Sequence, residues 1–134
     1  DNTPMPVRRA IGFVAVNDQG DIFLHRRPDQ GLLGGMLAFP EIGLASKQAD
    51  QNLDQTMAPF AADWVLHDEP VLHVFTHFAL EMKICLASIE GTPQPIAGDI
   101  KGHWAKPRPA DLPSLMRKIW KAAAAMPLPL HASR

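Results

Sequence analysis

The sequence predicts an α+β protein in which helices cover a mixed β-sheet, as in an α/β/α sandwich. Two observations carry this prediction. The chain has 134 residues, which is enough for one domain with a hydrophobic core and too few for two. Along the chain, the local patterns run in the order strand hairpin, loop, strand, helix, several strands and helix, which favours a sheet with helices packed against it.

The first expected elements form a β-hairpin. Apolar residues fill 10–16, the turn-forming sequence Asn-Asp-Gln-Gly occupies 17–20, and the apolar run resumes at 22–24. The sequence "PDQGLLGG" then predicts a loop, and "MLAF", closed by Pro40, predicts a short strand.

A short helix is expected in the polar span that follows Gly43. Leu53, Met57 and Phe60 are spaced four and three residues apart, which is typical of one face of an amphipathic helix. The residues 64–66, Trp-Val-Leu, then predict a short strand.

The longest run of strand-forming residues is 71–89. As a single strand it would extend for roughly 60 Å, several times the usual strand length. We therefore expect the chain to turn inside this run, although the run contains no glycine or proline. The expected position is "HVFTHF", residues 73–78, where polar and aromatic residues interrupt the aliphatic ones. A turn without turn-forming residues is locally inconsistent, and such places are often functional sites.

The C-terminal third adds one strand and one helix. "GHWAKP" predicts a short strand, and Ser114 is the expected N-cap of a helix that runs through Met126. Leu115, Ile119 and Ala122 are expected to face the core. We expect one domain over residues 7–126, with residues 1–6 as a linker of an excised or processed chain and 127–134 as a disordered tail.

Composition excludes several classes of protein. The chain is 46% hydrophobic and 20% charged, as in ordinary soluble domains. Its longest apolar run, 122–126, is far shorter than the ~18 residues of a membrane span, and "DNTPMPVRR" lacks the apolar core of a secretory signal. The single cysteine, Cys85, excludes an intramolecular disulfide or a cysteine-based metal site within this chain. We expect a buried thiol and a reducing, cytoplasmic compartment.

The charge is near neutral overall but unevenly placed. The formal net charge is −1. Residues 41–69 hold six acids against one lysine, and residues 101–121 hold six bases against one aspartate. A basic C-terminal third could meet phosphates, and it could equally be a solvated helix face. Trp104 and Trp120 are expected to be core or helix-packing residues.

The glycine-rich segment "GLLGG", residues 31–35, is the first candidate site. Glycines let a backbone approach a ligand closely. The segment has neither the Gly-Lys-Ser/Thr of a Walker loop nor a Gly-x-Gly-x-x-Gly fingerprint, so by itself it favours a structural turn. The candidate loop or phosphate contacts are Gly34, Gly35, Arg26 and Arg27; Lys106, Arg108, Arg117 and Lys118 are phosphate candidates only as a class.

The stretch "RRPDQGLLGGMLAFPE", residues 26–41, resembles the lead-in of the Nudix fold. In Nudix hydrolases a helix with an Arg-Glu-x-x-Glu-Glu cluster follows, because Mg²⁺ needs several hard oxygen ligands. This chain has no glutamate between Glu41 and Glu69, and the acids of the expected helix, Asp50 and Asp54, are more typical of a solvated face. The resemblance therefore implies a Nudix-like fold without the catalytic box, and with neither a metal nor a catalytic residue in this chain.

A series of segments resembles the C-terminal domain of MutY-type adenine DNA glycosylases. "GLLGGM" precedes an aromatic-Pro pair, "HVFTHFALEM" follows, and then come a tryptophan and "LPSLMRKI". This ordered resemblance extends from about Val7 to Lys121. It implies a role in base-excision repair, in which the parent glycosidase removes adenine paired with 8-oxoguanine and this domain recognises the 8-oxoguanine strand.

The same resemblance implies partners and site residues. A covalently linked N-terminal catalytic domain with a [4Fe-4S] cluster would lie outside this chain, and the fragment alone would be non-catalytic. The partner would be double-stranded DNA with 8-oxoguanine:adenine, in the bacterial nucleoid. The family's Phe-Ser-His motif, which approaches the lesion, corresponds to Phe75, Thr76 and His77. Threonine retains the hydroxyl, but its methyl group could crowd the base.

The residue types of this triplet suit that role, since an aromatic ring can stack on a base, a hydroxyl can read its edge, and an imidazole can reach a base or phosphate. The triplet could also be ordinary strand, and a metal pair of His73 and His77 lacks a third ligand. Two other functions stay open. One is a free-standing hydrolase of oxidised nucleotides with a degenerate box that depends on Asp50. The other is an inert Nudix-fold module that docks a protein partner.

Overall fold

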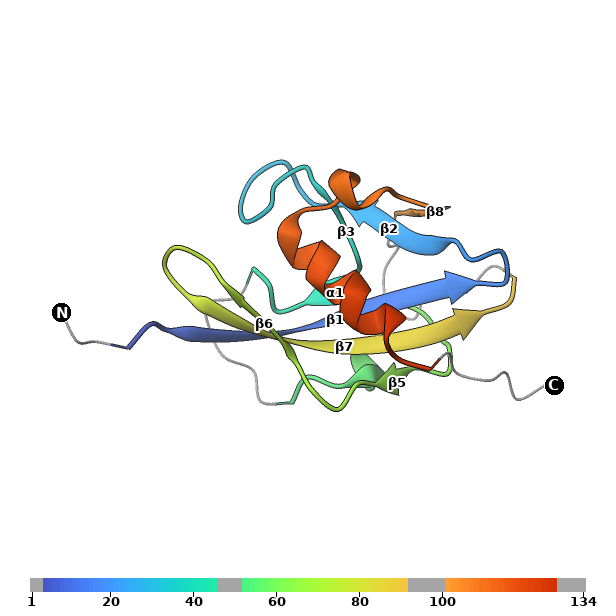
Figure 1. Ribbon diagram of the computed structural model, residues 1–134, viewed down its shortest axis with the longest axis horizontal. Coiled ribbons are helices and arrows are strands. Elements are labelled where there is room, and N and C mark those ends of the chain that lie inside the picture. Colours follow the sequence, from blue (N-terminus) through green and yellow to red (C-terminus); the bar gives the residue numbers. More distant parts are fainter. Residues whose placement is uncertain (1–3, 46–51, 92–100, 128–134) are drawn as a thin grey trace.

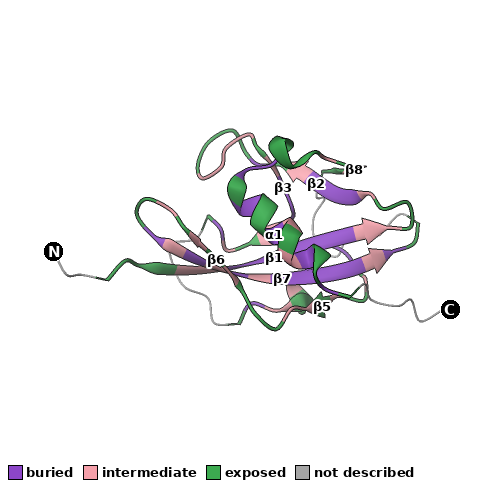
Figure 2. Cartoon of the chain, viewed as in Figure 1, coloured by how far each residue is buried: buried purple, intermediate pink, exposed green. Residues whose placement is uncertain are grey.

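The computed structural model describes residues 4–45, 52–91 and 101–127, and its centre is a pair of long parallel strands. Strand β1 (Val7–Asn17) runs parallel to β7 (Ala79–Ile89), paired from Val7 with Ala79 to Asn17 with Ile89. Both strands are buried over most of their length (Figure 2). Because both faces of this pair are covered, their sequences read as nearly continuous apolar runs.

The remaining strands extend the sheet on both sides of this pair (Figure 1). On one side, β2 (Ile22–Arg26) is antiparallel to β1 and pairs with β3 (Leu37–Ala38) and β8 (His103–Ala105), while β4 (Glu41–Ile42) pairs with β1. On the other side, β5 (Val65–Leu66) and β6 (Val71–Val74) are antiparallel to β7. The expected mixed sheet is therefore confirmed, and so are the first hairpin and the strand at 64–66.

One α-helix covers one face of the sheet. Helix α1 (Ser114–Ala124) crosses over β1 and β7 in Figure 1, and its Leu115, Met116 and Ile119 are buried there. They pack into a core cluster with the inward residues of β7, which include Leu80 and Met82. The opposite face carries two smaller clusters beneath the segment 53–66.

Two helical expectations were wrong in detail. Ser114 is not the N-cap, because Pro113 occupies that position and its carbonyl accepts the first helical bond from the N–H of Arg117 at 3.0 Å. Proline fits there because its ring fixes φ, which is −63° in Pro113, and because an N–H donor is not needed at this position. The core-facing alanine is Ala123, which is buried, whereas Ala122 is only half-buried.

The prediction of an amphipathic helix around 53–60 was also wrong for the part of the expected helix that the structure describes. Only one 3₁₀ turn forms there, η1 (Gln55–Met57), capped by the Asp54 carboxylate. Leu53 and Phe60 are nevertheless buried, so their spacing reflects a loop folded against the sheet. Residues 46–51 of the expected helix lie outside the described residues. A second 3₁₀ turn, η2 (Pro109–Asp111), precedes α1.

The turn expected inside 71–89 is confirmed. Strands β6 and β7 form a hairpin whose loop is 75–78, closed by the Phe75 N–H donating to the Phe78 carbonyl at 2.8 Å. The long run of strand formers is thus two antiparallel strands. None of the helices in the described part of the chain is long and apolar enough to cross a membrane.

Candidate nucleic-acid interface

The β6–β7 hairpin presents the predicted triplet at its tip. Thr76 and His77 are exposed, Phe75 is half-buried, and the neighbouring Phe78 is buried. In Figure 1 this loop projects at one end of the sheet, beside the N-terminal part of β1. The Thr76 hydroxyl and the His77 imidazole are therefore available to a ligand, while the aromatic residues on either side of them anchor the loop.

An aromatic stack forms the base of the tip. The rings of Phe75 and Phe78 stack with their centroids 4.8 Å apart, and His73 meets Phe75 edge-on, also at 4.8 Å. At the other end, the Arg8 guanidinium lies 3.7 Å from the centroid of the Phe78 ring. Four side chains from two strands and a loop thus lie in a row. Each of these aromatic and cation–π contacts stabilises the row by more than the burial of the side chains alone. This stack substitutes for the glycine or proline that a tight loop usually needs.

His73 sits within this stack as a neutral ring. Its Nδ1 is buried and has no hydrogen-bond partner among the described residues. Burial lowers the pKa of His73, and the positive charge of Lys118 on α1 lowers it further. The uncharged imidazole therefore acts as an aromatic neighbour of Phe75.

The glycine loop forms a second group of predicted residues, held by its own contacts. Gly35 has φ +70°, and its carbonyl accepts from Arg26 Nη1 at 3.0 Å. A Cβ on Gly34 would lie 2.5 Å from the carbonyl oxygen of Asp29, so only glycine fits there. The glycines therefore serve the close folding of the loop on itself.

Arg27 is the most buried polar residue described, with 8% of its surface exposed. Its Nε donates to the Leu32 carbonyl at 2.9 Å and its Nη1 to Glu41 Oε1 at 2.6 Å. Glu41 Oε2 in turn accepts from the Leu44 N–H at 3.0 Å. Arg27 and Glu41 thus tie the glycine loop to the chain that follows Pro40, and both charged groups are engaged within the protein.

The structure keeps these two groups of predicted residues separate. Phe75, Thr76 and His77 share one hairpin, whereas Arg26, Arg27, Gly34 and Gly35 share the 28–36 loop and its root. Across residues 4–45, 52–91 and 101–127, no hydrogen bond, ion pair or ring contact joins the two groups.

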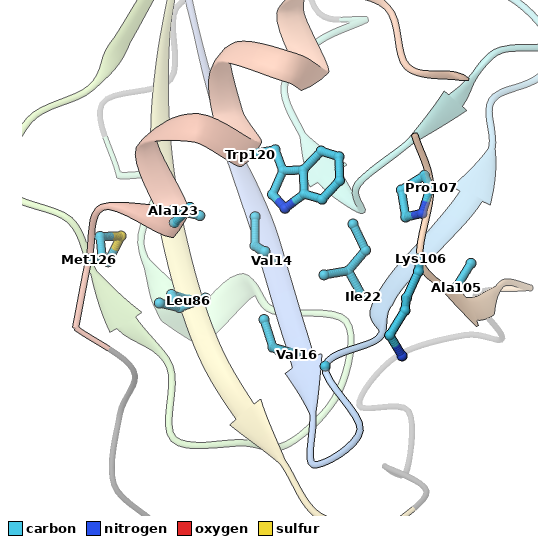
Figure 3. A pocket seen from close by; sticks show the side chains of 12 residues that line it. Val14, Val16, Ile22, Leu86, Ala105, Lys106, Pro107, Trp120, Ala123 and Met126 are labelled. Carbon is cyan, nitrogen blue, oxygen red and sulfur yellow. The ribbon is translucent and has the colours of Figure 1, made fainter. Parts of the chain in front are cut away.

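A separate apolar pocket of about 440 Å³ lies between α1 and the end of the β1–β2 hairpin (Figure 3). Val14, Ile22 and Trp120 line it, with Lys106 at its side. The ammonium of Lys106 pairs with the Asp21 carboxylate, and none of the hairpin triplet lines this pocket.

Arg8 and Phe78 were not predicted as site residues from the sequence. Arg8 lies in a strand-forming segment far from the triplet in sequence, and only the parallel pairing of β1 with β7 brings the two together. The arginine pair at 8–9 could have indicated such a residue. Adjacent side chains of a strand point to opposite faces of the sheet, so one of the two arginines must lie on the face of the hairpin aromatics.

Comparison with known proteins defines the class. Residues 11–122 match the NUDIX domain family, and the chain belongs to that family. Within this family, the chain resembles adenine DNA glycosylases of the MutY type. It is similar to the adenine DNA glycosylase of Rattus norvegicus, with 29% identity over 110 residues, covering 75% of this chain and 21% of that protein. The adenine DNA glycosylase of Mus musculus is 28% identical over 78 residues, covering 54% and 15%. The chain thus spans about a fifth or less of the length of these relatives.

Solved structures agree on the fold. The C-terminal domain of mouse MUTYH, solved in complex with human PCNA, matches with a TM-score of 0.60 and 18% identity over 84% of both chains. A MutT protein from Methanosarcina mazei matches with a TM-score of 0.58 and 12% identity, over 92% of this chain and 96% of that one.

The metal site of a Nudix hydrolase does not fit the described residues. The Glu41 carboxylate is occupied by Arg27 and by the Leu44 N–H. Asp54 caps η1, and hydrogen bonds from Thr56 lower the pKa of its carboxyl. In the part of the chain that the structure describes, no three His, Cys, Asp or Glu side chains are grouped to hold a metal ion. Asp50, which the hydrolase alternative requires, lies outside the described residues.

Proposed function

We propose that this chain is the lesion-recognition domain of an adenine DNA glycosylase, and that it contacts 8-oxoguanine opposite adenine through the tip of the β6–β7 hairpin. The single observation that carries the proposal is the geometry of the triplet: the Thr76 hydroxyl and His77 imidazole are exposed on a loop that Phe75 and Phe78 anchor. The similarity to adenine DNA glycosylases supports the assignment of this tip to that chemistry.

The proposed contact uses what oxidation adds to guanine. Oxidation at C8 adds a carbonyl oxygen and turns N7 from an acceptor into an N–H donor. A threonine hydroxyl can accept one hydrogen bond and donate another, so Thr76 is able to use both changes at one edge of the base. Unoxidised guanine offers N7 only as an acceptor. The expected discrimination is that of one or two hydrogen bonds, about 2- to 10-fold for each at ~1 kcal/mol.

The proposal includes what the MutY resemblance implies for the parent protein. A catalytic helical domain with an iron–sulfur cluster would be joined to this chain, and the parent protein would act on nucleoid DNA in a bacterial cytoplasm. In that arrangement the chain itself contributes binding and orientation. The engagement of Glu41 by Arg27 and the capping role of Asp54 leave these two carboxylates unsuited to activating water, which argues against hydrolysis at this place in the fold.

The test is the affinity of the chain for matched DNA duplexes. Fluorescence anisotropy with duplexes that contain 8-oxoguanine:adenine, guanine:adenine or guanine:cytosine at one central position should give the lowest dissociation constant for the first. Equal dissociation constants for the three duplexes would reject lesion recognition by this chain. Mg²⁺-dependent release of phosphate or pyrophosphate from an oxidised nucleotide, lost in Asp50→Asn, would instead support the hydrolase.

A further inference from the structure

Two cations at the ends of the aromatic stack have no acidic partner in the described residues. Arg8 lies on the outer face of Phe78, and the four ion pairs found in the described part of the chain do not include it. Lys118 approaches the other end, where its charge acts on His73, and its Nζ lies 3.4 Å from the Leu72 carbonyl. Both therefore keep donors that can serve an external anion.

The neighbouring residue, Arg9, is an arginine whose charge is paired within the protein. Arg9 is adjacent to Arg8 in β1, but its side chain lies on the opposite face of the sheet. Its Nη2 pairs with Glu81 at 3.3 Å, on the partner strand β7. Arg8, on the face that carries α1 and the hairpin aromatics, is half-buried, and its guanidinium carbon lies 3.7 Å from the centroid of the Phe78 ring. This contact places the guanidinium before any ligand arrives, and its fork of N–H donors matches the geometry of a phosphate.

We propose that Arg8 and Lys118 form a phosphate-binding pair that holds the sugar–phosphate backbone of the nucleic-acid strand whose base meets the hairpin tip. The inference rests on the proposed function and adds to it the residues that supply affinity. Phosphate contacts position a protein on DNA without reading sequence, whereas base contacts specify. The division of labour here is that Arg8 and Lys118 position the strand, and Thr76 and His77 read the base.

This pair also accounts for how a chain of net charge −1 could bind a polyanion. Binding strength depends on the cations that meet phosphates and the counterions they release, and the total charge of the chain matters less. An arginine and a lysine beside one exposed loop, neither of them in an ion pair of the described residues, give a local positive site.

The test is the salt dependence of binding. Association constants of the 134-residue chain for an 8-oxoguanine:adenine duplex are measured at a series of KCl concentrations, for the unaltered protein and for Arg8→Gln, Lys118→Gln and the control Arg9→Gln. Arg8→Gln and Lys118→Gln should each make the slope of log K against log[KCl] shallower by about 0.9. Arg9→Gln removes the same charge from the opposite face and should leave the slope unchanged.

A variant that keeps the charge separates binding from folding. Arg8→Lys should retain the slope even if loss of the contact with Phe78 lowers the melting temperature. Lys118 is exposed on α1, so Lys118→Gln should fold normally and can test the pair on its own. Unchanged slopes in both Arg8→Gln and Lys118→Gln would overturn the inference.

The outcome also separates this inference from the proposed function. Removing a phosphate contact weakens binding about equally for all sequences, so the ratio of affinities for the 8-oxoguanine:adenine and guanine:adenine duplexes should stay the same in Arg8→Gln. Shallower slopes together with equal affinities for the two duplexes would reject lesion recognition and retain the phosphate pair. A clear preference for the lesion with unchanged slopes would reject the phosphate pair and retain lesion recognition. No binding to any duplex would reject both proposals.

Discussion

Arg27 and Glu41 form a buried ion pair that joins the glycine loop to the strand after Pro40. Their side chains are 7% and 11% exposed, and the Nη1–Oε1 distance is 2.6 Å. Arg27 and Glu41 lie near the two ends of the segment "RRPDQGLLGGMLAFPE". The ion pair therefore connects the two ends of the sequence feature that marks the fold. In this chain the arginine is part of the scaffold on which the hairpin site is displayed.

Breaking this pair from one side should strongly destabilise the protein. Glu41→Gln leaves the Arg27 charge buried without a counter-charge, which typically costs about 3–5 kcal/mol of unfolding free energy. Urea denaturation followed by tryptophan fluorescence measures the change. The matched control is Arg108→Gln, which breaks an exposed pair with Asp111 and should not measurably alter stability. A loss in Glu41→Gln no larger than in this control would contradict the structural role.

Substitution by alanine should destabilise the protein to different extents at Gly34 and at Gly31. Gly34→Ala places a Cβ 2.5 Å from the Asp29 carbonyl oxygen and forces the backbone to shift. Gly31 has φ +89° but open space around its Cβ position, so Gly31→Ala should cost only the conformational strain, about 1 kcal/mol. The melting temperature should therefore fall further in Gly34→Ala, and the reverse order would show that the loop packs differently.

Much of the fold follows from local patterns, and the rest depends on pairing between distant segments. The hairpin at 7–26, the strand at 103–105 and the helix at 114–124 each have a clear periodicity or turn signal. The parallel pairing of β1 with β7 has none, because it joins segments about seventy residues apart. The helix predicted at 53–60 failed because apolar residues at helical spacing can also be buried by an irregular segment that folds over a sheet.

Acidification should weaken the protein through two half-buried histidines. Burial lowers the pKa of His25 and of His73, and each has a buried nitrogen without a hydrogen-bond partner in the described residues. The unfolded chain, with histidine pKa values near 6.5, then binds more protons than the folded chain. The free energy of unfolding should therefore fall as the pH drops through 6.5 toward the lowered pKa values. Denaturation between about pH 7.5 and about pH 5.5, where histidine is the main side chain to titrate, measures it.

The matched variant for this effect is His25→Leu, which removes one of the two titrating groups. It should show a smaller loss of stability over the same pH range than the unaltered chain. His77→Leu, at the exposed hairpin tip, is the matched substitution at an exposed position. A pH dependence in His25→Leu identical to that of the unaltered chain would show that His25 is not held neutral by burial.

Cys85 should be unreactive in the folded protein. It is fully buried in β7, and burial together with the charge of Asp54 raises the pKa of its thiol to about 12. An aromatic disulfide reagent should label no thiol at neutral pH and label one after unfolding in urea. Rapid labelling without denaturant would contradict the buried position of this strand.

The candidate site could be predicted in part. The triplet 75–77 was identifiable because a turn had to fall in a run without glycine or proline. Its supporting residues were not, since Arg8 meets Phe78 only through the pairing of β1 with β7. The candidate phosphate contacts at 26, 27, 34 and 35 form one loop as their proximity in sequence suggests, but the engagement of Arg27 by Glu41 depends on side-chain burial that no sequence pattern specifies.

The proposed function requires that the hairpin tip reads the oxidised base, and Thr76→Val removes the group that would do so. Valine preserves the size of threonine and removes only its hydroxyl, at an exposed position where folding should be unaffected. The measurement is the ratio of dissociation constants for guanine:adenine and 8-oxoguanine:adenine duplexes. This ratio should fall by about 2- to 10-fold in Thr76→Val and be retained in Thr76→Ser. A ratio equal to that of the unaltered chain in Thr76→Val would contradict the proposed function.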